Sequence, residues 1–390
     1  MRRKQAWFGL ILALVLAGSG WLALNARRTG PRPLAATLAE AAPAQTGAAG
    51  FARADGPKPL SFPADYGPHD DYQTEWWYYT GNLTTADGQH FGYQLTFFRR
   101  ALLPPAERSP RAADWAAGQV YLAHLALTDV AGKHHYVYQR LERGAAGLAG
   151  ATAQPYRVWL DSWSVSGAED APVHLAATEG ALALQLDLVS QKAPVPQGDR
   201  GYSRKGPEAG NASYYYSLTH LATTGTVMVN GRAFNVQGLS WMDHEYSTSA
   251  LSAGAAGWDW VSLQLSDGRD LMVFQIRRAD GAPDPYAAGI LVAADGSTQR
   301  LGPGDFVLRA TGQWRSPRSG AVYPSGWTLS IRPVGLELIL TPYLADQELD
   351  VGYTYWEGAT EVTGRAGGAT VTGSGYVELT GYAGSMAGQF

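Results

Sequence analysis

Cysteine is absent from the 390-residue chain, so neither a disulfide framework nor a lipidated cysteine is available. Charged residues make up only 16% of the sequence, and the net charge is −4. This composition leaves no basic stripe, and we expect no nucleic-acid partner. A Gly-x-Ser-x-Gly segment is also missing, which removes the nucleophile elbow of α/β-hydrolases. The fold must therefore be held by packing, and 13 Trp, 21 Tyr and 10 Phe can supply the core.

The N-terminus has the pattern of an export signal. Basic residues at positions 2–4 and 27–28 flank an apolar run from Ala6 to Leu24. This pattern predicts a signal peptide or membrane anchor over residues 1–28, with its cleavage left open. We expect an exported protein that is periplasmic, anchored facing the periplasm, or secreted. Residues 29–58 are rich in Ala, Pro, Gly and Thr, which predicts a flexible tether.

The remaining chain consists of short alternating runs separated by turn residues. Phe91 to Phe98 follows Asp87-Gly88, and Val261 to Leu265 precedes Asp267-Gly268. Alternation with a period of two beside Asp-Gly turns predicts β-hairpins. No helical stripe is sustained after Leu24. We therefore predict an all-β fold of antiparallel barrels, and the length favours two domains.

Carboxylates lie within aromatic strands at three places, residues 74–79, 240–246 and 258–260. Side chains alternate along a strand, so Trp241 and Asp243 share a face. In an ordinary strand the acidic side chains face solvent and the aromatic side chains fill the core. Trp241 and Asp243 cannot both follow this rule, because they share a face. A buried carboxyl is costly unless it is hydrogen-bonded or protonated, which makes Asp243 a site candidate. We expect it to face the interior of the first barrel.

Several segments together resemble the lipocalin-like family that includes carotenoid 1,2-hydratases (hydroxyneurosporene synthases) and AttH-type secreted proteins. In chain order they are Glu75–Tyr79, Asp199–Gly206, Ser213–Ser217, Trp241–Glu245 and Gly257–Trp260. The resemblance extends from about Phe62 to the Gly375–Leu379 strand. It implies two tandem lipocalin-like barrels, over residues 59–248 and 249–390.

The resemblance also implies a chemistry. In the hydratases an Asp of the matching strand is the proton donor to an isoprenoid double bond, and by position this role falls on Asp243. The chain departs from the hydratase pattern where Tyr214-Tyr215-Tyr216 contains no His and where Trp241 replaces a Tyr, so it is closer to the AttH-type branch. We expect His244 or Glu75 to place the attacking water.

The predicted ligand is a small hydrophobic molecule, an isoprenoid or other lipid. Aromatic faces can stabilise a cation, and basic residues at a barrel mouth can meet an anionic head group. The predicted ligand-binding residues are Trp77, Tyr79, Tyr214, Tyr216, Trp241, Trp258, Trp260, Arg200 and Arg204. We predict no cofactor and no metal, and membrane contact only through an uncleaved N-terminal segment. A non-catalytic lipid carrier and a glycan-binding or glycan-cleaving module remain alternatives.

Overall fold

The computed structural model describes residues 49–108, 117–167, 172–248, 251–252, 254–280 and 284–386. Within these ranges the only helices are three short 3₁₀ turns, at Ala64–Tyr66, Pro105–Glu107 and Arg332–Val334. The all-β prediction is therefore confirmed. The helix expected over residues 1–28 lies outside the described residues. No helix in the described ranges is long and apolar enough to cross a membrane.

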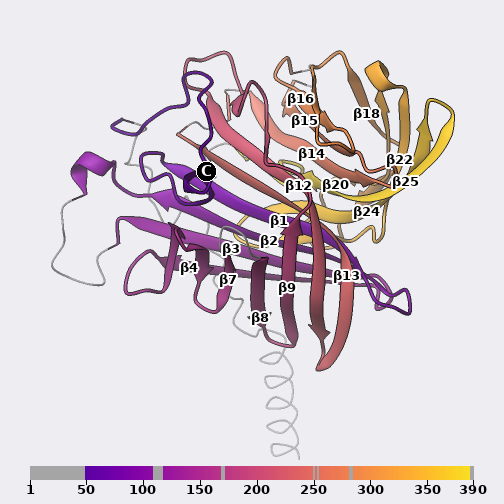
Figure 1. Ribbon diagram of the computed structural model, residues 1–390, viewed down its shortest axis with the longest axis horizontal. Coiled ribbons are helices and arrows are strands. Elements are labelled where there is room, and N and C mark those ends of the chain that lie inside the picture. Colours follow the sequence, from indigo (N-terminus) through magenta and orange to yellow (C-terminus); the bar gives the residue numbers. More distant parts are fainter. Residues whose placement is uncertain are drawn as a thin grey trace, which may run out of the picture. The chain divides into compact units, whose positions relative to one another are not determined.

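The first sheet is antiparallel and contains thirteen strands. In spatial order its main path is β4 (His134–Arg143), β3 (Gln119–Asp129), β2 (His90–Ala101), β1 (Thr74–Thr84), β13 (Arg232–Ser247), β12 (Ala212–Val229), β9 (Leu182–Ser190), β8 (Val173–Glu179), β7 (Trp163–Gly167), β6 (Tyr156–Leu160) and β5 (Ala149–Ala153). The short strands β10 (Val195–Pro196) and β11 (Tyr202–Arg204) pair with β12. The sheet curves into a nearly closed barrel (Figure 1).

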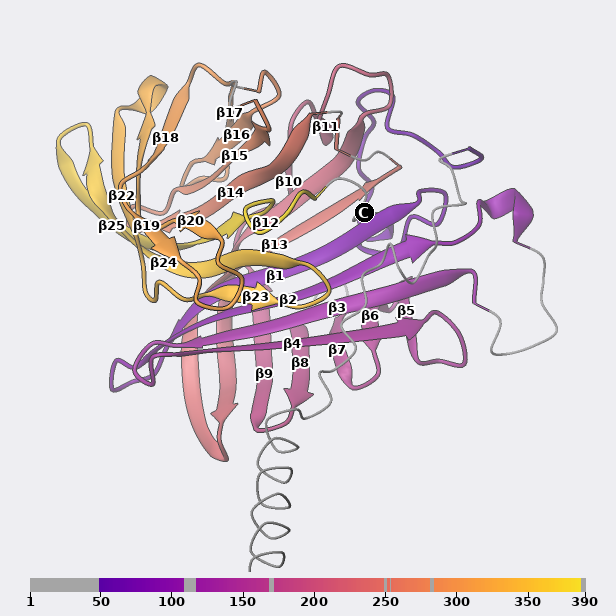
Figure 2. The ribbon, with the colours of Figure 1, turned by 180° about the vertical axis from the view of Figure 1, so that it is seen from behind.

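The second sheet has ten strands and begins after β13. Its main path is β17 (Thr298–Leu301), β16 (Ala288–Val292), β15 (Asp270–Arg278), β14 (Ala255–Leu265), β25 (Ala369–Leu379), β24 (Thr354–Ala366), β22 (Leu336–Pro342), β21 (Trp327–Ile331) and β18 (Phe306–Ala310). Strand β23 (Glu348–Asp350) pairs with β24, while β19 (Gln313–Arg315) and β20 (Val322–Pro324) pair with each other. Figure 2 shows the same strands from behind.

Each sheet opens with a hairpin that the sequence predicted. Gly88 and Gly268 take φ values of 84° and 82° in the β1–β2 and β14–β15 turns. Glycine adopts this left-handed region without the cost that a Cβ would impose. The two Asp-Gly pairs therefore mark real turns at corresponding places in the two sheets.

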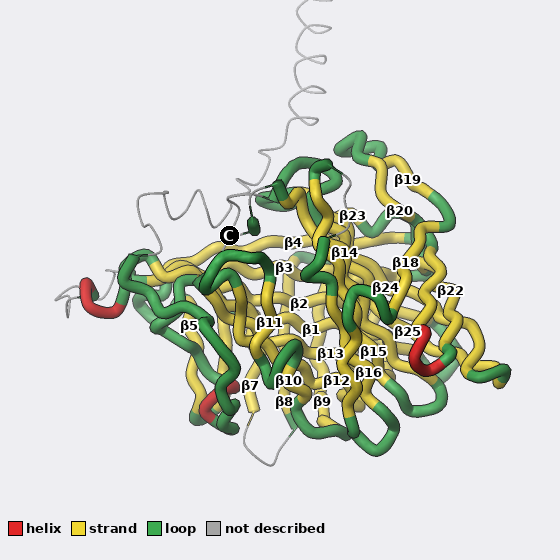
Figure 3. The backbone as a smooth tube through the Cα atoms, turned by 90° about the horizontal axis from the view of Figure 1, so that it is seen from above, coloured by secondary structure: helices red, strands yellow, loops and turns green. Residues whose placement is uncertain are grey.

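Apolar residues form a core inside each sheet and a further layer between the sheets. Trp77 and Trp163 lie in the first core, and Trp327 and Trp356 lie in the second. The layer between the sheets joins residues of β1, β12 and β13 to residues of β14, β15 and β25, and includes Trp260. Figure 3 shows strands through the interior of this arrangement, with loops around its edges and a few short helical turns. Strand β1 and the parts of β12 and β13 beside it, residues 212–219 and 240–247, are consequently covered on both faces.

The two faces of β13 hold different side chains. Met242 packs in the first core, whereas Trp241 packs in the layer between the sheets. Asp243 therefore faces the second sheet, and the expectation that it points into the first barrel is wrong. The error has a physical cause, because the outer face of this sheet is buried as well.

Residues 51–58, at the end of the predicted tether, pack against the first sheet. Phe51 and Ala54 are buried. The Tyr214 hydroxyl donates to the Gly56 carbonyl at 2.9 Å, and the Lys58 ammonium lies 4.3 Å from the centroid of the Tyr214 ring. These residues belong to the packed fold.

Candidate functional site

A cavity of about 150 Å³ lies between the two sheets. One wall comes from β1, β2, β12 and β13, and the other comes from β14, β15, β24 and β25. Aromatic side chains from both walls line it, among them Trp76, Tyr78, Trp258, Trp260 and Phe274. A cavity of this volume holds a group about the size of benzene. The cavity therefore suits a small apolar group.

Asp243 carries a carboxyl into this cavity and is 4% exposed. Its Oδ2 accepts a hydrogen bond from the Tyr215 hydroxyl at 2.6 Å. Its Oδ1 accepts from the Ser217 hydroxyl at 2.5 Å and from the Trp241 indole at 2.7 Å. The Tyr215 oxygen in turn accepts from the Trp260 indole at 3.2 Å. Three donors from β12 and β13 thus fix the carboxyl in place, and Trp260 of β14 in turn holds Tyr215.

Burial sets the acidity of Asp243. Loss of water around the carboxyl raises the pKa of Asp243 to about 7, although the bonds from Ser217, Tyr215 and Trp241 act to lower it. The charge of Glu245 adds to the rise. Near neutral pH a large fraction of this carboxyl is therefore protonated, as a general acid requires.

Strand register explains which side chains surround Asp243. Ser217 of β12 and Tyr78 of β1 both lie directly opposite Asp243. Directly opposite residues of antiparallel strands point to the same face. Tyr215 is opposite Glu245 and reaches the same face two residues away.

The other wall of the cavity carries two more acids. Glu357 of β24 lies directly opposite Glu378 of β25, and both line the cavity. The Trp258 indole donates to Oε2 of Glu378 at 2.8 Å. Burial raises the pKa of Glu378 to about 7, and burial together with the charge of Glu378 raises the pKa of Glu357 well above its usual range. The cavity thus holds acids on both walls.

One basic residue lines the cavity. The Lys205 ammonium lies 3.0 Å from Oε1 of Glu245 and 4.6 Å from the centroid of the Phe274 ring. Arg200 and Arg204, predicted for this role, are exposed and do not line the cavity. Lys205, their neighbour in sequence, takes the position expected for them.

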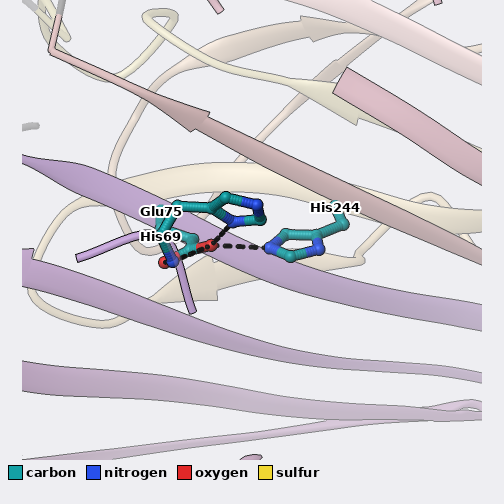
Figure 4. Close-up of side chains that lie close together, drawn as sticks. All are labelled: His69, Glu75 and His244. Atoms are coloured by element: carbon teal, nitrogen blue, oxygen red, sulfur yellow. Dashed lines mark hydrogen bonds and ion pairs between the residues drawn. The ribbon is translucent and has the colours of Figure 1, made fainter. Parts of the chain in front are cut away.

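Glu75 and His244 lie on the opposite face of the first sheet from Asp243. Oε1 of Glu75 accepts hydrogen bonds from Nε2 of His244 and Nδ1 of His69, each at 2.8 Å (Figure 4). Oε2 of Glu75 accepts from Nε of Arg99 at 2.8 Å. The prediction that Glu75 or His244 places water for Asp243 is therefore wrong, because their side chains do not line the cavity.

The same three residues have the composition of a metal site. One atom each of His69, Glu75 and His244 lies within 4.8 Å of the other two, and two imidazoles with a carboxylate suit zinc or iron. However, each of these atoms is already hydrogen-bonded, and the cation of Arg99 sits on Glu75. A divalent ion would have to displace protons beside a guanidinium. The arrangement fits a closed hydrogen-bond network better than a ligand set.

Charges within this network are balanced. Both ring nitrogens of His69 meet carboxylates at 2.8 Å, from Asp65 and Glu75. Burial alone would lower the pKa of His69, but these two partners outweigh it and raise the pKa. Burial alone would raise the pKa of Glu75, but Arg99, His244 and His69 hold it well below its usual range. The network therefore holds paired ions inside the first barrel.

Several other predicted aromatic residues do not line the cavity. Tyr79 bonds to the Tyr156 hydroxyl at 2.7 Å, and Trp77 packs in the first core. The residues that do not line the cavity are Trp77, Tyr79, Tyr214, Tyr216 and Trp241, although Trp241 holds Asp243. Of the predicted residues, Asp243, Trp258 and Trp260 meet in the cavity.

Residues missed in the sequence fall into two groups. The first group is Trp76, Tyr78 and Tyr215, which line the cavity. They lie in segments that carry the family resemblance, but the residues predicted to bind the ligand were their neighbours on the other strand face. Glu357 and Glu378 were not singled out. Glu357 follows Tyr355-Trp356, the same pattern of an acid in an aromatic strand that identified Asp243, and this signal was available.

The chain is similar to known proteins in both sequence and structure. The AttH-like family model matches residues 53–382. The chain belongs to the AttH-like family. The structure of an AttH-type protein of Nitrosomonas europaea, NE1406, is 38% identical with a TM-score of 0.74, covering 85% of this chain and 100% of that one. The resemblance seen in the sequence is thereby confirmed.

More distant structural neighbours share the fold alone. Kievitone hydratase from Nectria haematococca is 14% identical with a TM-score of 0.64, over 88% of this chain and 98% of that one. CghA, in a structure with Sch210972, is 14% identical with a TM-score of 0.50, over 87% and 98% of the two chains. No curated protein sequence matches the chain. The lipocalin-like fold predicted from the sequence is confirmed.

Proposed function

We propose that the cavity between the sheets is the active site of a hydratase, which adds water to a carbon–carbon double bond of an apolar ligand. The observation that carries this proposal is Asp243, a buried carboxyl in an aromatic cavity. Its raised pKa of about 7 lets it hold a proton at working pH and give it to an alkene. The fold shared with kievitone hydratase supports the proposal.

The reaction needs an acid and a means of stabilising a cation. Transfer of the Asp243 proton to one alkene carbon forms a C–H bond and leaves a tertiary cation on the neighbouring carbon. The ring faces of Trp76, Trp258 and Trp260 line the cavity and attract such a cation by roughly 1–2 kcal/mol each when desolvated. Water then forms the C–O bond and releases one proton, so alkene and water give a tertiary alcohol.

Cavity size limits what part of the ligand can enter. The volume of about 150 Å³ accommodates a branched five-carbon end group but not a whole long-chain lipid. An isoprenoid would therefore place its terminal unit beside Asp243 and extend the rest outward. The half-buried Lys205 lines the cavity and can meet a polar or anionic portion of such a ligand. An aromatic cavity of this size does not suit a glycan chain.

The test is hydration in labelled water. Purified protein is incubated with geraniol, farnesol and 2-prenylphenol in H₂¹⁸O, and the products are analysed by mass spectrometry. We expect at least one probe to gain one water carrying the label. If the probes bind, as followed by tryptophan fluorescence, but all are recovered unchanged, the hydratase proposal fails and the carrier alternative replaces it.

The pH profile of hydration should depend on Tyr215. Its hydroxyl bond to Oδ2 stabilises the ionised form of Asp243 and acts to lower its pKa. Tyr215→Phe should therefore raise the pKa, so that Asp243 stays protonated and active to higher pH. We expect the alkaline limb of kcat/KM to move up by about one to two pH units. Tyr79→Phe, which alters a tyrosine inside the first barrel, is the matched control. If kcat/KM falls at the same alkaline pH in wild type and in Tyr215→Phe, Asp243 does not control the rate.

Export is a separate proposal. It is supported by the apolar run from Ala6 to Leu24 between basic residues. Residues 1–60 fused to alkaline phosphatase, which is active only after export from the bacterial cytoplasm, should give enzyme activity. Replacing three leucines of the run by arginine should abolish that activity, and activity that persists in this variant would refute the assignment.

A further inference from the structure

Two carboxyls of the second sheet face each other across one strand pair and line the cavity. Glu357 and Glu378 are directly opposite in the β24–β25 register. Directly opposite side chains have Cβ atoms about 4.5–5.5 Å apart. Glu357 is buried and Glu378 is partly buried. Two carboxyls at this spacing and so little exposed disfavour simultaneous ionisation, and such a pair keeps a proton.

Glu357 has hydrogen-bonding capacity that the protein does not use. It is 1% exposed, and neither carboxyl oxygen has a hydrogen-bond partner among the described residues. The hydroxyls of Tyr78 and Tyr355 lie nearby and act to lower its pKa, but neither reaches hydrogen-bond geometry. Buried polar atoms are usually paired. An unpaired carboxyl that lines a cavity indicates a bound molecule that donates to it.

No cation neutralises the pair within the described ranges. The groups that interact with it are Asp243 and Glu245 of β13, Tyr78 of β1, Tyr353, Tyr355 of β24, Tyr376 of β25 and Trp258 of β14. Lys205 lines the same cavity but is ion-paired with Glu245. The pair therefore has to be compensated by a shared proton rather than by a basic side chain.

We propose that Glu357 and Glu378 share one proton and form the base of the site, which accepts the proton released by the attacking water. This inference rests on the proposed hydratase function and identifies the base for its second step, the attack of water on the cation. Asp243 stands on the wall formed by the first sheet, and the pair stands on the wall formed by the second. Acid and base thus act on a ligand held between them, and water adds from the side of the pair.

The proton balance closes without another reactant. Asp243 loses its proton as the C–H bond forms. Water forms the C–O bond, its O–H bond breaks, and the pair now carries two protons while Asp243 is ionised. Transfer of one proton from the pair to Asp243 through cavity water restores the starting state. One alkene and one water have become one alcohol.

Proton sharing can be measured without a ligand. Infrared titration of the Asp243→Asn protein should show the C=O band of a protonated carboxyl that persists above pH 7. Adding Glu357→Gln should move the titration of the remaining carboxyl down by at least about one pH unit, because its charged partner is gone. Adding Glu361→Gln, an exposed acid of the same strand, should leave the titration unchanged. Equal titrations in all three proteins would overturn proton sharing.

Turnover tests the base role. With geraniol as the probe, Glu357→Gln and Glu378→Gln should each lower kcat about 100-fold with KM changed less than about twofold. Both variants should melt at or above the wild-type temperature, since a neutral amide removes the cost of keeping two acids side by side away from water. Glu361→Gln should match wild type in both constants.

The outcomes separate the two proposals. If Asp243→Asn is inactive while both Gln variants keep the wild-type kcat, the base assignment is wrong and the hydratase proposal stands. If the wild-type protein hydrates none of the probes, the hydratase proposal fails and the base assignment fails with it. If the Gln variants lose kcat only because they melt at a lower temperature, the pair is structural and the base assignment is overturned.

Discussion

Asp243→Asn is expected to reduce kcat for hydration by about 10²–10⁴-fold, with KM nearly unchanged. The amide keeps the shape of the carboxyl, and its oxygen can still accept the bonds from Ser217 and Trp241. It has no acidic proton to transfer to an alkene. The loss should therefore fall on the chemical step and not on binding. Steady-state kinetics and ligand-induced quenching of tryptophan fluorescence measure the two effects separately.

A matched control is Asp187→Asn, which alters an exposed acid of β9 outside the cavity. It should hydrate the probe at the wild-type rate. The prediction is contradicted if Asp243→Asn hydrates the probe at the wild-type rate and melts several degrees lower than wild type. In that case Asp243 would be a structural hydrogen-bond acceptor, and the acid would have to be sought among the other carboxyls of the cavity.

The sequence was sufficient for the fold because its local signals are strong. The Asp87-Gly88 and Asp267-Gly268 turns place each glycine at a positive φ, and alternating runs lead into and out of them. Such short-range patterns determine hairpins directly. The family motifs then extended the prediction to the lipocalin-like fold, and the match over residues 53–382 confirmed it.

The site was predicted less completely because register is not a local property. Alternation showed that Trp241 and Asp243 share a face, but not which face meets which partner. Tyr78 and Ser217 oppose Asp243 only through pairing with strands far away in the chain. Without that pairing, choosing Trp77 and Tyr79 in place of Trp76 and Tyr78 is an even chance. A shift of one residue exchanges every side chain between the faces.

Recognising Asp243 as buried was correct, but the reason for its burial was different. An ordinary barrel strand has one buried face, the barrel interior, and one solvated face. In the structure both faces of β13 are covered from Ser240 to Ser247, one by the first core and one by the second sheet. This also explains why acids occur on both faces of these strands. Those on the inner face form the His69–Glu75–His244 network, and those on the outer face line the cavity.

The inner network should contribute mainly to stability, and Arg99→Met should show this most strongly. Arg99 is 0% exposed and donates to Glu75 and to the carbonyls of His69 and Tyr72 at 2.8, 2.9 and 3.0 Å. Removing it leaves the Glu75 charge buried without its main counter-ion. Breaking one side of such a buried pair costs about 3–5 kcal/mol. Urea unfolding should report this loss as a lower midpoint.

The double variant Arg99→Met/Glu75→Gln distinguishes an unpaired charge from a simple packing defect. It should recover part of the lost stability because no buried charge is left uncompensated. Arg278→Met, which breaks an exposed pair with Asp280, should change stability little. If the double variant were no more stable than Arg99→Met, the loss would come from packing and not from charge.

Acid should narrow the difference between wild type and Arg99→Met. The pKa of Glu75 lies well below its usual range in the folded protein because Arg99, His244 and His69 outweigh burial. A carboxyl of this kind contributes stability that is fully present above its unfolded pKa of about 4.3 and is lost as the pH falls toward the folded value. Arg99→Met has already lost most of this contribution to folding stability at pH 7. The two unfolding midpoints should therefore converge between about pH 4 and pH 2, and a difference that stayed constant over that range would mean that Arg99 does not act through the Glu75 charge.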